Sequence, residues 1–274
     1  ILEQLGCQVR KLFFEMDGRF PNHEPDPSVL KNMVPLKETV VGEGLELGIA
    51  FDGDGDRMGV VDEKGNIIYG DMLMVIFARE ILKEIPGATF IGEVKCSHRM
   101  YDDIKAHGGR PTMWKTGHSL IKQKLKEEKA VLAGEMSGHF FFAHRYFGYD
   151  DAIYATCRLL EIVAQRQEPL SRFLADLPQT YNTPEIRISC PEENKFRLVE
   201  MVKEELAKDH EIVDIDGVRI IFPDGWGLLR ASNTSPVLVL RFEAESEERL
   251  KQIRSLVEDT LEKMKARISR MESI

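Results

Sequence analysis

The sequence predicts an α/β protein in which mixed or parallel sheet domains are covered by helices and are followed by a C-terminal α+β domain. Between residues 88 and 133, short apolar runs alternate with amphipathic segments, as in βαβ units. After residue 185 the order becomes strand, helix, three strands and helix, which favours an α+β layer. Hydrophobic residues make up 43% of the chain and charged residues 30%, which is enough apolar material for real cores.

In the first part of the chain, periodicity and turn residues predict the elements. Apolar residues between Met72 and Leu82 recur at helical spacing; we expect Asp71 to cap this helix, and Pro86 and Gly87 to end it. The expected elements are, in order, a buried strand 47–51, hairpin strands 58–62 and 66–69, a helix 71–85, strand 89–94, a helix ending at 107, strand 112–114, helix 118–129, strand 130–133 and helix 150–167.

Prolines at 169, 178 and 184 indicate a linker near residues 177–183, after which a new domain begins. The elements expected in this domain are strand 186–190, helix 194–208, strands 211–214, 218–222 and 237–242, and helix 246–267.

Composition excludes several classes of protein. Lys and Arg number 37 against 46 Asp and Glu, and the net charge of −9 disfavours a broad nucleic-acid-binding face. The four cysteines form no CxxC pair, which argues against a zinc site or a disulfide framework and fits a reducing cytoplasm. No apolar stretch approaches the roughly 20 residues of a membrane span, and no signal peptide is visible. Because the chain starts at Ile1 without Met, we expect a fragment of a longer protein.

The segment FDGDGDR, residues 51–57, carries the clearest chemical signal. Asp52, Asp54 and Asp56 alternate with glycines, and residues two apart in an extended strand lie about 6.6 Å from each other, too far to share one Mg²⁺. The loop must therefore curl, which glycine permits, and the three carboxylates would then converge on one hard cation.

Two alternatives for this segment stay open. One is an Asp/Gly surface turn without a ligand. The other is an EF-hand calcium loop, with Glu63 at position 12, although Arg57 stands where that loop needs Gly and the flanks are strands.

A second loop, GEMSGH at residues 134–139, follows an apolar strand. Glu135 accepts hydrogen bonds, Ser137 donates and accepts them, and His139 has an ordinary pKa of about 6.5, so this set can bind vicinal hydroxyls or move a proton. A histidine with a purely structural role is the alternative.

The turn RASNTSP, residues 230–236, combines Arg230, two hydroxyls, an amide and backbone N–H groups, and Arg241 lies on the next strand. These groups suit a phosphate monoester, although turns of this composition are also common without a ligand. Lys95, Lys115 and His118 each follow a predicted strand, where ligands gather in open α/β sheets; solvated or capping roles are equally open for them.

Together these residues resemble the α-D-phosphohexomutase family, and within it the bacterial phosphomannomutase/phosphoglucomutase group. The resemblance covers nearly the whole chain. It rests on PNHEPDP (21–27), DGDGDR, VKC, GGRPTMWKTGHSLIK (108–122), GEMSGH, YFGYDDAIYA (146–155), DGVR and GWGLLRASNTSPVLVLRFEA. It implies three domains: the end of domain II with the metal loop in residues 1–65, domain III with the sugar-binding loop in 66–178, and domain IV with the phosphate-binding loop in 179–274.

The resemblance implies reversible phosphoryl transfer between the 1- and 6-positions of a hexose through a 1,6-bisphosphate, with a phosphoserine as donor. The expected partners are mannose or glucose phosphates, and the expected cofactor is Mg²⁺ held by Asp52, Asp54 and Asp56. Arg57, Lys95, His118 and His139 match catalytic positions, with His139 as candidate acid/base. The positions that match substrate ligands are Glu135, Ser137, His139, Arg230, Ser232, Asn233, Thr234 and Arg241.

The sequence departs from the family in one large respect, since it contains no Thr-Ala-Ser-His-Asn-Pro nucleophile loop. Ser97 lies in VKCSHR, which matches a different loop. We therefore expect a cytoplasmic mutase fragment that is inactive alone and whose full-length form is a monomer. The alternative is a non-catalytic sugar-phosphate-binding protein.

Overall fold

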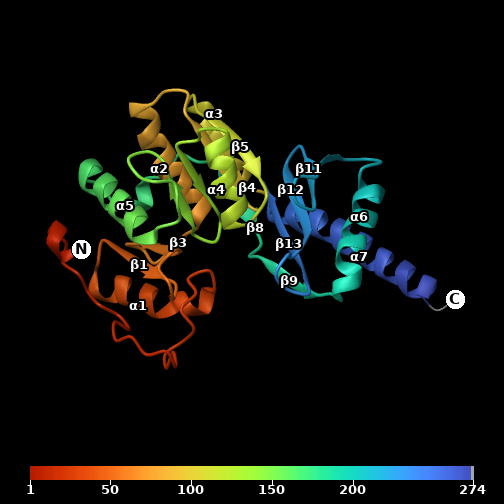
Figure 1. Cartoon of the computed structure of the whole chain (residues 1–274), viewed down its shortest axis with the longest axis horizontal. Coiled ribbons are helices and arrows are strands. Elements are labelled where there is room, and N and C mark those ends of the chain that lie inside the picture. The colour runs from red at the N-terminus through yellow and green to blue at the C-terminus, as the bar shows by residue number, and fades with distance from the viewer. Residues whose placement is uncertain (273–274) are drawn as a thin grey trace. The chain divides into compact units, whose positions relative to one another are not determined.

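The computed structural model describes residues 1–272 and divides the chain into two compact units, Ile1–Leu177 and a second that begins at Pro178 (Figure 1). The predicted α/β class followed by an α+β domain is confirmed. No helix within residues 1–272 combines the length and the apolarity needed to cross a membrane.

The first unit opens with a long irregular segment that contains the 3₁₀ turns Glu3–Leu5 and Leu30–Met33 and leads into α1 (Val34–Glu43). An antiparallel sheet follows, in the order β1 (Leu47–Phe51), β2 (Met58–Asp62) and β3 (Ile67–Ile68). The sequence analysis expected a buried strand at 47–51. The strand is confirmed as β1, but the expectation that it is buried is wrong, because β1 pairs with β2 alone and only Gly48 is buried.

A second sheet forms the rest of this unit, in the order β5-β4-β6-β7. Strand β4 pairs in parallel with β5 and β6, whereas β7 runs antiparallel to β6. The bounds are α2 Gly70–Glu84, β4 Thr89–Glu93, α3 His98–Ala106, β5 Arg110–Trp114, α4 His118–Glu127, β6 Leu132–Gly134, β7 Phe140–Phe142, α5 Ala152–Arg166 and a 3₁₀ turn Leu170–Arg172.

Helices cover both faces of this sheet because alternate strand residues point to opposite sides. Phe90, Leu132 and Phe140 pack with residues of α2, α3 and α5. Ile91 and Phe141 pack with residues of α4 on the other face. The parallel strands therefore end at one edge, where their following loops carry Lys95, His118 and Glu135.

The second unit is an antiparallel sheet with two helices. Its elements are β8 (Tyr181–Asn182), β9 (Ile186–Ser189), α6 (Glu192–Leu206), β10 (Glu211–Val213), β11 (Val218–Phe222), β12 (Gly225–Ala231), β13 (Val237–Ala244) and α7 (Glu247–Glu272). The strand order is β10-β11-β12-β13, and both β8 and β9 pair with β13. Residues of α6 and α7, such as Val202 and Val257, pack with Leu240 and Phe242 of β13.

Three details of the sequence prediction are wrong. Strand β12 was not expected, because Gly225 and Gly227 interrupt the β pattern; a Cβ on Gly225 would lie 2.5 Å from the Glu243 carbonyl oxygen. Strand β7 was not expected because it has only three residues. Asp71 is not the N-cap of α2, since the helix begins at Gly70 and Asp71 instead accepts from the amides of Met72 and Ser97.

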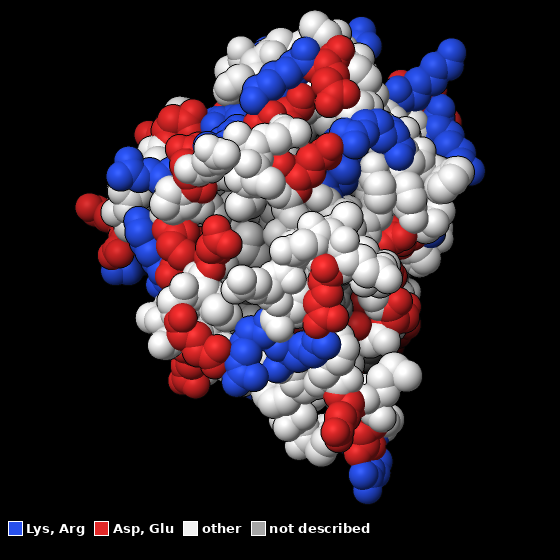
Figure 2. Space-filling view, turned by 90° about the vertical axis from the view of Figure 1, so that its left-hand side faces the viewer, with Lys and Arg blue, Asp and Glu red and all other residues white. Residues whose placement is uncertain are grey.

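Charges of both signs are interspersed on the surface. On the face drawn in Figure 2, groups of Lys and Arg alternate with groups of Asp and Glu, separated by uncharged areas. This face carries no broad area of one sign.

Candidate metal centre and sugar-phosphate loops

The metal loop connects the antiparallel strands β1 and β2 and is curled by one of its own side chains. Asp52 Oδ1 accepts from the backbone amides of Gly55 and Asp56, both at 3.1 Å, and of Arg57 at 3.0 Å. Gly55 adopts a φ of +75°, which few other residues tolerate. The loop therefore has the compact shape that a shared ion requires.

The curled loop brings three carboxylates together. One oxygen from each of Asp52, Asp54 and Asp56 lies within 4.8 Å of the others. Asp52 is buried, Asp56 is partly buried and Asp54 is exposed, so the cluster opens toward solvent on the Asp54 side. Asp56 Oδ1 is buried and lies 3.3 Å from His139 Nε2 and 4.0 Å from Arg57 Nε. Hard carboxylate oxygens in such a cluster fit a small divalent cation.

The pKa values of Asp52 and Asp56 shift in opposite directions. Burial pushes the pKa of Asp52 upward, but hydrogen bonds from Arg57 and its amide outweigh burial and hold this pKa below its usual value. Burial raises the pKa of Asp56, and the neighbouring Asp52 raises it further. A cation bound here would favour the ionised form of both groups.

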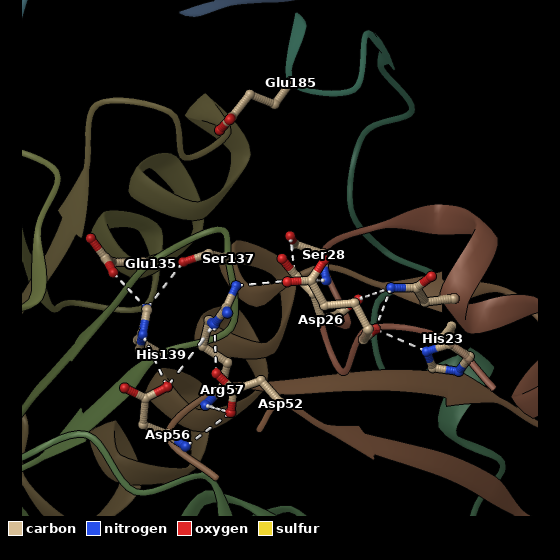
Figure 3. Close-up of polar contacts among 12 residues, drawn as sticks. His23, Asp26, Ser28, Asp52, Asp56, Arg57, Glu135, Ser137, His139 and Glu185 are labelled. Carbon is tan, nitrogen blue, oxygen red and sulfur yellow. Dashed lines mark hydrogen bonds and ion pairs between the residues drawn. The ribbon is translucent and has the colours of Figure 1, made fainter. Parts of the chain in front are cut away.

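Arg57 ties the metal loop to the N-terminal segment. Its Nε donates to Asp52 Oδ2 at 2.8 Å, and its Nη1 donates to Asp26 Oδ1 at 3.1 Å (Figure 3). The sequence analysis quoted PNHEPDP, which contains Asp26, but gave that residue no role. Its charge next to a proline-rich turn was the only available signal.

The GEMSGH loop lies against the metal loop. His139 Nε2 is 3.3 Å from Asp56 Oδ1, and His139 Nδ1 is 2.7 Å from Glu135 Oε2 and 3.2 Å from Ser137 Oγ (Figure 3). The Met58 amide also donates to the Gly138 carbonyl at 3.1 Å. Two motifs more than 70 residues apart thus share one histidine.

Carboxylates on both sides favour the charged form of this histidine. Burial lowers the pKa of His139, but Glu135 and Asp56 outweigh burial, so the pKa lies above its usual value. For Glu135, burial has the opposite effect and raises the pKa. The contact with His139 and the hydrogen bond from the Gly117 amide outweigh burial, so the pKa of Glu135 lies below its usual value. Together the pair favours a proton on the imidazole.

Lys95 and His118 lie in the two neighbouring loops, and a fully buried carboxylate connects those loops. Glu93 Oε2 accepts from the Lys95 amide at 2.7 Å and from Thr116 Oγ1 at 2.9 Å, and its Oε1 accepts from the Met136 amide at 3.3 Å. Burial raises the pKa of Glu93. The sequence analysis missed Glu93, although its place at the end of a predicted strand, directly before VKC, was a usable signal.

His118 is exposed beside Asp150, which the sequence analysis also left without a role. The His118 Nδ1 to Asp150 Oδ2 distance is 3.6 Å, and Lys122 Nζ lies 3.0 Å from Asp150 Oδ1. The rings of His118 and His139 stack with centroids 6.4 Å apart. Lys115, in the same loop, is exposed. Glu63 binds the Ser171 amide at 3.1 Å, so it lacks the role that the calcium-loop alternative requires.

The RASNTSP segment forms the end of β12 and the connection to β13. Arg230 is buried, and its Nε donates to Asp216 Oδ2 at 3.0 Å. Asn233 and Thr234 are exposed, and the Thr234 amide donates to Ser232 Oγ at 3.3 Å. Arg241 lies on the same sheet face as Arg230, because the strand partner of Arg230 is Val239.

Family models match nearly the whole chain. The model for phosphoglucomutase/phosphomannomutase domain II matches residues 1–65, the model for the alpha/beta/alpha domain III matches residues 69–181, and the model for the C-terminal domain matches residues 185–260. The chain belongs to the phosphoglucomutase/phosphomannomutase family. The resemblance seen in the sequence is therefore confirmed.

Several members of this family are similar over most of the chain. The phosphomannomutase/phosphoglucomutase of Pseudomonas syringae pv. tomato is 50% identical over 265 residues, 96% of this chain and 57% of that protein. The phosphoglucomutase of Neisseria gonorrhoeae is 48% identical over 261 residues, 94% of this chain and 56% of that protein. The chain thus spans little more than half the length of these relatives.

Solved structures of the phosphoglucomutase/phosphomannomutase family have the same fold. A family member from Burkholderia thailandensis has a TM-score of 0.89 at 44% identity, covering 96% of this chain and 56% of that one. The Aspergillus fumigatus N-acetylphosphoglucosamine mutase in complex with GlcNAc-6P and magnesium has a TM-score of 0.58 at 14% identity, covering 78% of this chain and 48% of that one, a likeness of fold alone.

Proposed function

We propose that this chain supplies the metal, sugar and phosphate loops of a phosphomannomutase/phosphoglucomutase, which interconverts hexose 1-phosphate and 6-phosphate through a 1,6-bisphosphate. The observation that carries the proposal is the contact series from Asp56 through His139 to Glu135. It joins a cation-type carboxylate cluster to a loop suited to sugar hydroxyls. Relatives with 50% sequence identity to the chain are named phosphomannomutase/phosphoglucomutase.

Asp52, Asp54 and Asp56 would hold Mg²⁺, because their oxygens already lie close together and carboxylate oxygens are the ligands that this ion prefers. When bound, the ion supplies charge neutralisation for a transferring phosphoryl group. Asp52 is also needed to curl the loop, so Asp54 and Asp56 have more freedom to adjust to an ion.

The other residues of this unit would bind substrate and handle protons. Arg57 offsets phosphate charge, and Lys95 and His118 contact phosphate or sugar from the neighbouring loops. Glu135 accepts from sugar hydroxyls and Ser137 donates to them or accepts from them. His139, held between two carboxylates, can give its Nε2 proton to a sugar oxygen and recover it later.

The phosphate that is not transferred would be bound by Arg230, Ser232, Asn233, Thr234 and Arg241. Guanidinium groups, hydroxyls and turn amides together suit a phosphate dianion. One such set can serve either phosphate of a hexose bisphosphate, because both are monoesters of the same charge.

Calorimetry on the 274-residue chain with glucose 6-phosphate and mannose 6-phosphate tests this proposal. Both sugars should bind, and Arg230→Ala should weaken both about tenfold, since a charge-assisted contact contributes about 1.5 kcal/mol or more. Arg254→Ala is the matched control, because Arg254 pairs with Glu258 on the surface of α7. Equal affinities for the parent chain and Arg230→Ala would contradict the role of this loop.

Competition extends the test to the sugar. The GEMSGH loop offers a carboxylate and a hydroxyl for hydroxyl groups, so we expect hexoses with a 2-hydroxyl in either configuration. If glucosamine 6-phosphate binds far better than both hexose phosphates, the assignment to this substrate class is wrong.

A further inference from the structure

Helix α6 buries a lysine against the back of the 232–236 loop. The side chain of Lys195 is 1% exposed. Its Nζ donates to the Ser232 carbonyl at 2.6 Å and to the Ser235 carbonyl at 3.3 Å, and it lies 2.6 Å from Glu192 Oε1. The three N–H bonds of the ammonium group thus have three acceptors.

This contact sets the direction of a loop peptide. In a trans peptide the C=O and the N–H point in opposite directions. Because the Ser232 carbonyl points at Lys195, the Asn233 amide points away from α6, on the side where Asn233 and Thr234 are exposed. Within residues 1–272 that amide donates no hydrogen bond to another backbone group.

Stability alone gives little reason for a lysine here. Neighbouring inward residues of α6, such as Leu198 and Val202, are apolar. Removing an ammonium group from water is costly, and buried charges can often be replaced by apolar residues without loss of stability. A cation is useful at this position if the loop must keep its carbonyls inward and its amides outward.

We propose that Lys195 is a positioning residue for phosphate binding: it fixes the 232–235 backbone so that the Asn233 amide faces the phosphate, and it places a positive charge behind the loop. This inference rests on the proposed function and adds a residue outside the RASNTSP motif, 35 positions before Arg230. Lys195 itself does not touch the ligand.

The test is calorimetry on the full chain, with inorganic phosphate and glucose 6-phosphate as probes. Lys195→Met should weaken both by about tenfold, equivalent to about 1.4 kcal/mol. Lys203→Met is the matched control, because it removes the same charge from the same helix, where Lys203 pairs with Glu200 and Asp214 on the surface. Glu192→Gln keeps the ammonium contacts to the loop. Both should bind within about twofold of the parent.

An NMR readout separates positioning from a general loss of structure. At saturating phosphate, the Asn233 amide proton should shift strongly downfield in the parent and in Lys203→Met, and much less in Lys195→Met. Lys195→Leu, which also removes the N–H donors and the charge, gives the same test if Lys195→Met does not fold.

The outcomes are distinct. If the parent binds both probes and the folded Lys195 variants match it in affinity and in the Asn233 shift, the positioning role is wrong while the proposed function stands. If the parent binds neither phosphate nor glucose 6-phosphate, both the proposed function and the positioning role of Lys195 are wrong.

Discussion

Asp52 uses one carboxylate oxygen to hold three backbone amides of its own loop. The cost of ordering the loop is therefore met within the fold, before any ion arrives. Asp54 has a different position, because it is exposed and shares the cluster without holding the loop together. This division makes Asp54 the best residue for testing metal binding separately from folding.

We expect Asp54→Asn to weaken Mn²⁺ and Mg²⁺ binding about tenfold or more, since it removes a charge and a preferred oxygen ligand at a cost of about 1.5 kcal/mol or more. Titration calorimetry measures the effect. Asp214→Asn, at an exposed position beside Lys203, is the control. Unchanged ion binding in Asp54→Asn would mean that the cation binds elsewhere.

Glu93 is the second residue whose loss has a defined consequence. Glu93→Ala leaves the buried Lys95 amide, the partly buried Met136 amide and a threonine hydroxyl without their acceptor, so the free energy of unfolding should fall by about 2 to 4 kcal/mol. Urea denaturation measures this change. Glu128→Ala also removes an acceptor from a threonine hydroxyl, at a partly exposed position, and should cost under about 1 kcal/mol. Similar losses in both variants would contradict the importance of burial.

At the scale of elements, α2 begins directly against the GEMSGH loop, and a glycine makes this approach possible. A Cβ on Gly70 would lie 2.2 Å from the Glu135 carbonyl oxygen and 3.1 Å from the Gly138 nitrogen. The first residue of α2 can therefore lie this close to the GEMSGH loop only because it has no side chain.

Gly70→Ala should displace the loop, lower the melting temperature and weaken glucose 6-phosphate binding by about tenfold, although alanine is the better helix former by up to about 1 kcal/mol. Gly42→Ala in α1 is the control, because no atom lies within 4 Å of its added Cβ, and it should be neutral or stabilising. A Gly70→Ala chain as stable as Gly42→Ala, with parent affinity, would rule out this constraint.

Another contact joins α5 to the turn after β7 and depends on pH. Burial lowers the pKa of His144, and Arg158, whose Nη2 lies 3.2 Å from the imidazole Nδ1, lowers it further, against an opposing effect of Glu84. The folded state therefore favours neutral His144. Its contribution to stability is complete above the ordinary pKa of about 6.5 and is lost as the pH falls through the lower folded-state value.

The contribution of His144 to the free energy of unfolding should thus fall between pH 7 and pH 5, so lowering the pH over this range should destabilise the parent more than His144→Gln. Urea denaturation at pH 7, 6 and 5 provides the comparison. Parallel slopes for parent and variant would show that His144 does not contribute.

Periodicity and turn residues predicted the elements between residues 88 and 133, because apolar runs and amphipathic segments alternate there and turn residues such as Gly108 and Gly109 separate them. The rule that ligands gather at the carboxyl ends of parallel strands singled out Lys95, Lys115 and His118, which follow the neighbouring parallel strands β4 and β5. The contacts of Asp26 with Arg57 and of Lys195 with Ser232 join residues 31 and 37 positions apart. No local pattern encodes such pairs, so the sequence could not predict them.

At the scale of the whole molecule, the loops carry groups suited to binding and positioning a sugar phosphate, but the sequence has no phosphoserine loop of the family type. Ser97 is a poor substitute. It is buried, and its Oγ accepts from the Arg99 amide as the N-cap of α3. Positioning and charge stabilisation supply much of the catalysis of phosphoryl transfer, yet the group must still be carried between two half-reactions.

We therefore expect the 274-residue chain to bind glucose 1-phosphate but to show no mutase turnover with glucose 1,6-bisphosphate as activator. A coupled assay for glucose 6-phosphate measures this. A chimera in which the chain replaces the matching part of the Pseudomonas syringae relative should be active and is the positive control. Turnover by the chain alone that is lost on Ser97→Ala would identify Ser97 as the nucleophile.

Two of the four cysteines are buried next to the candidate ligand loops. Cys96 is fully buried with its Sγ 4.0 Å from Glu93 Oε1, and Cys190 is buried with its amide bonded to the Pro236 carbonyl. Each therefore lies beneath one of the ligand loops, whereas Cys7 and Cys157 are partly exposed. A thiol reagent reaches a buried cysteine only when the structure above it opens. Labelling rates at Cys96 and Cys190, resolved by mass spectrometry, therefore report local opening at the two loops separately. A ligand that stabilises the closed form of one loop should slow the labelling of the cysteine beneath that loop.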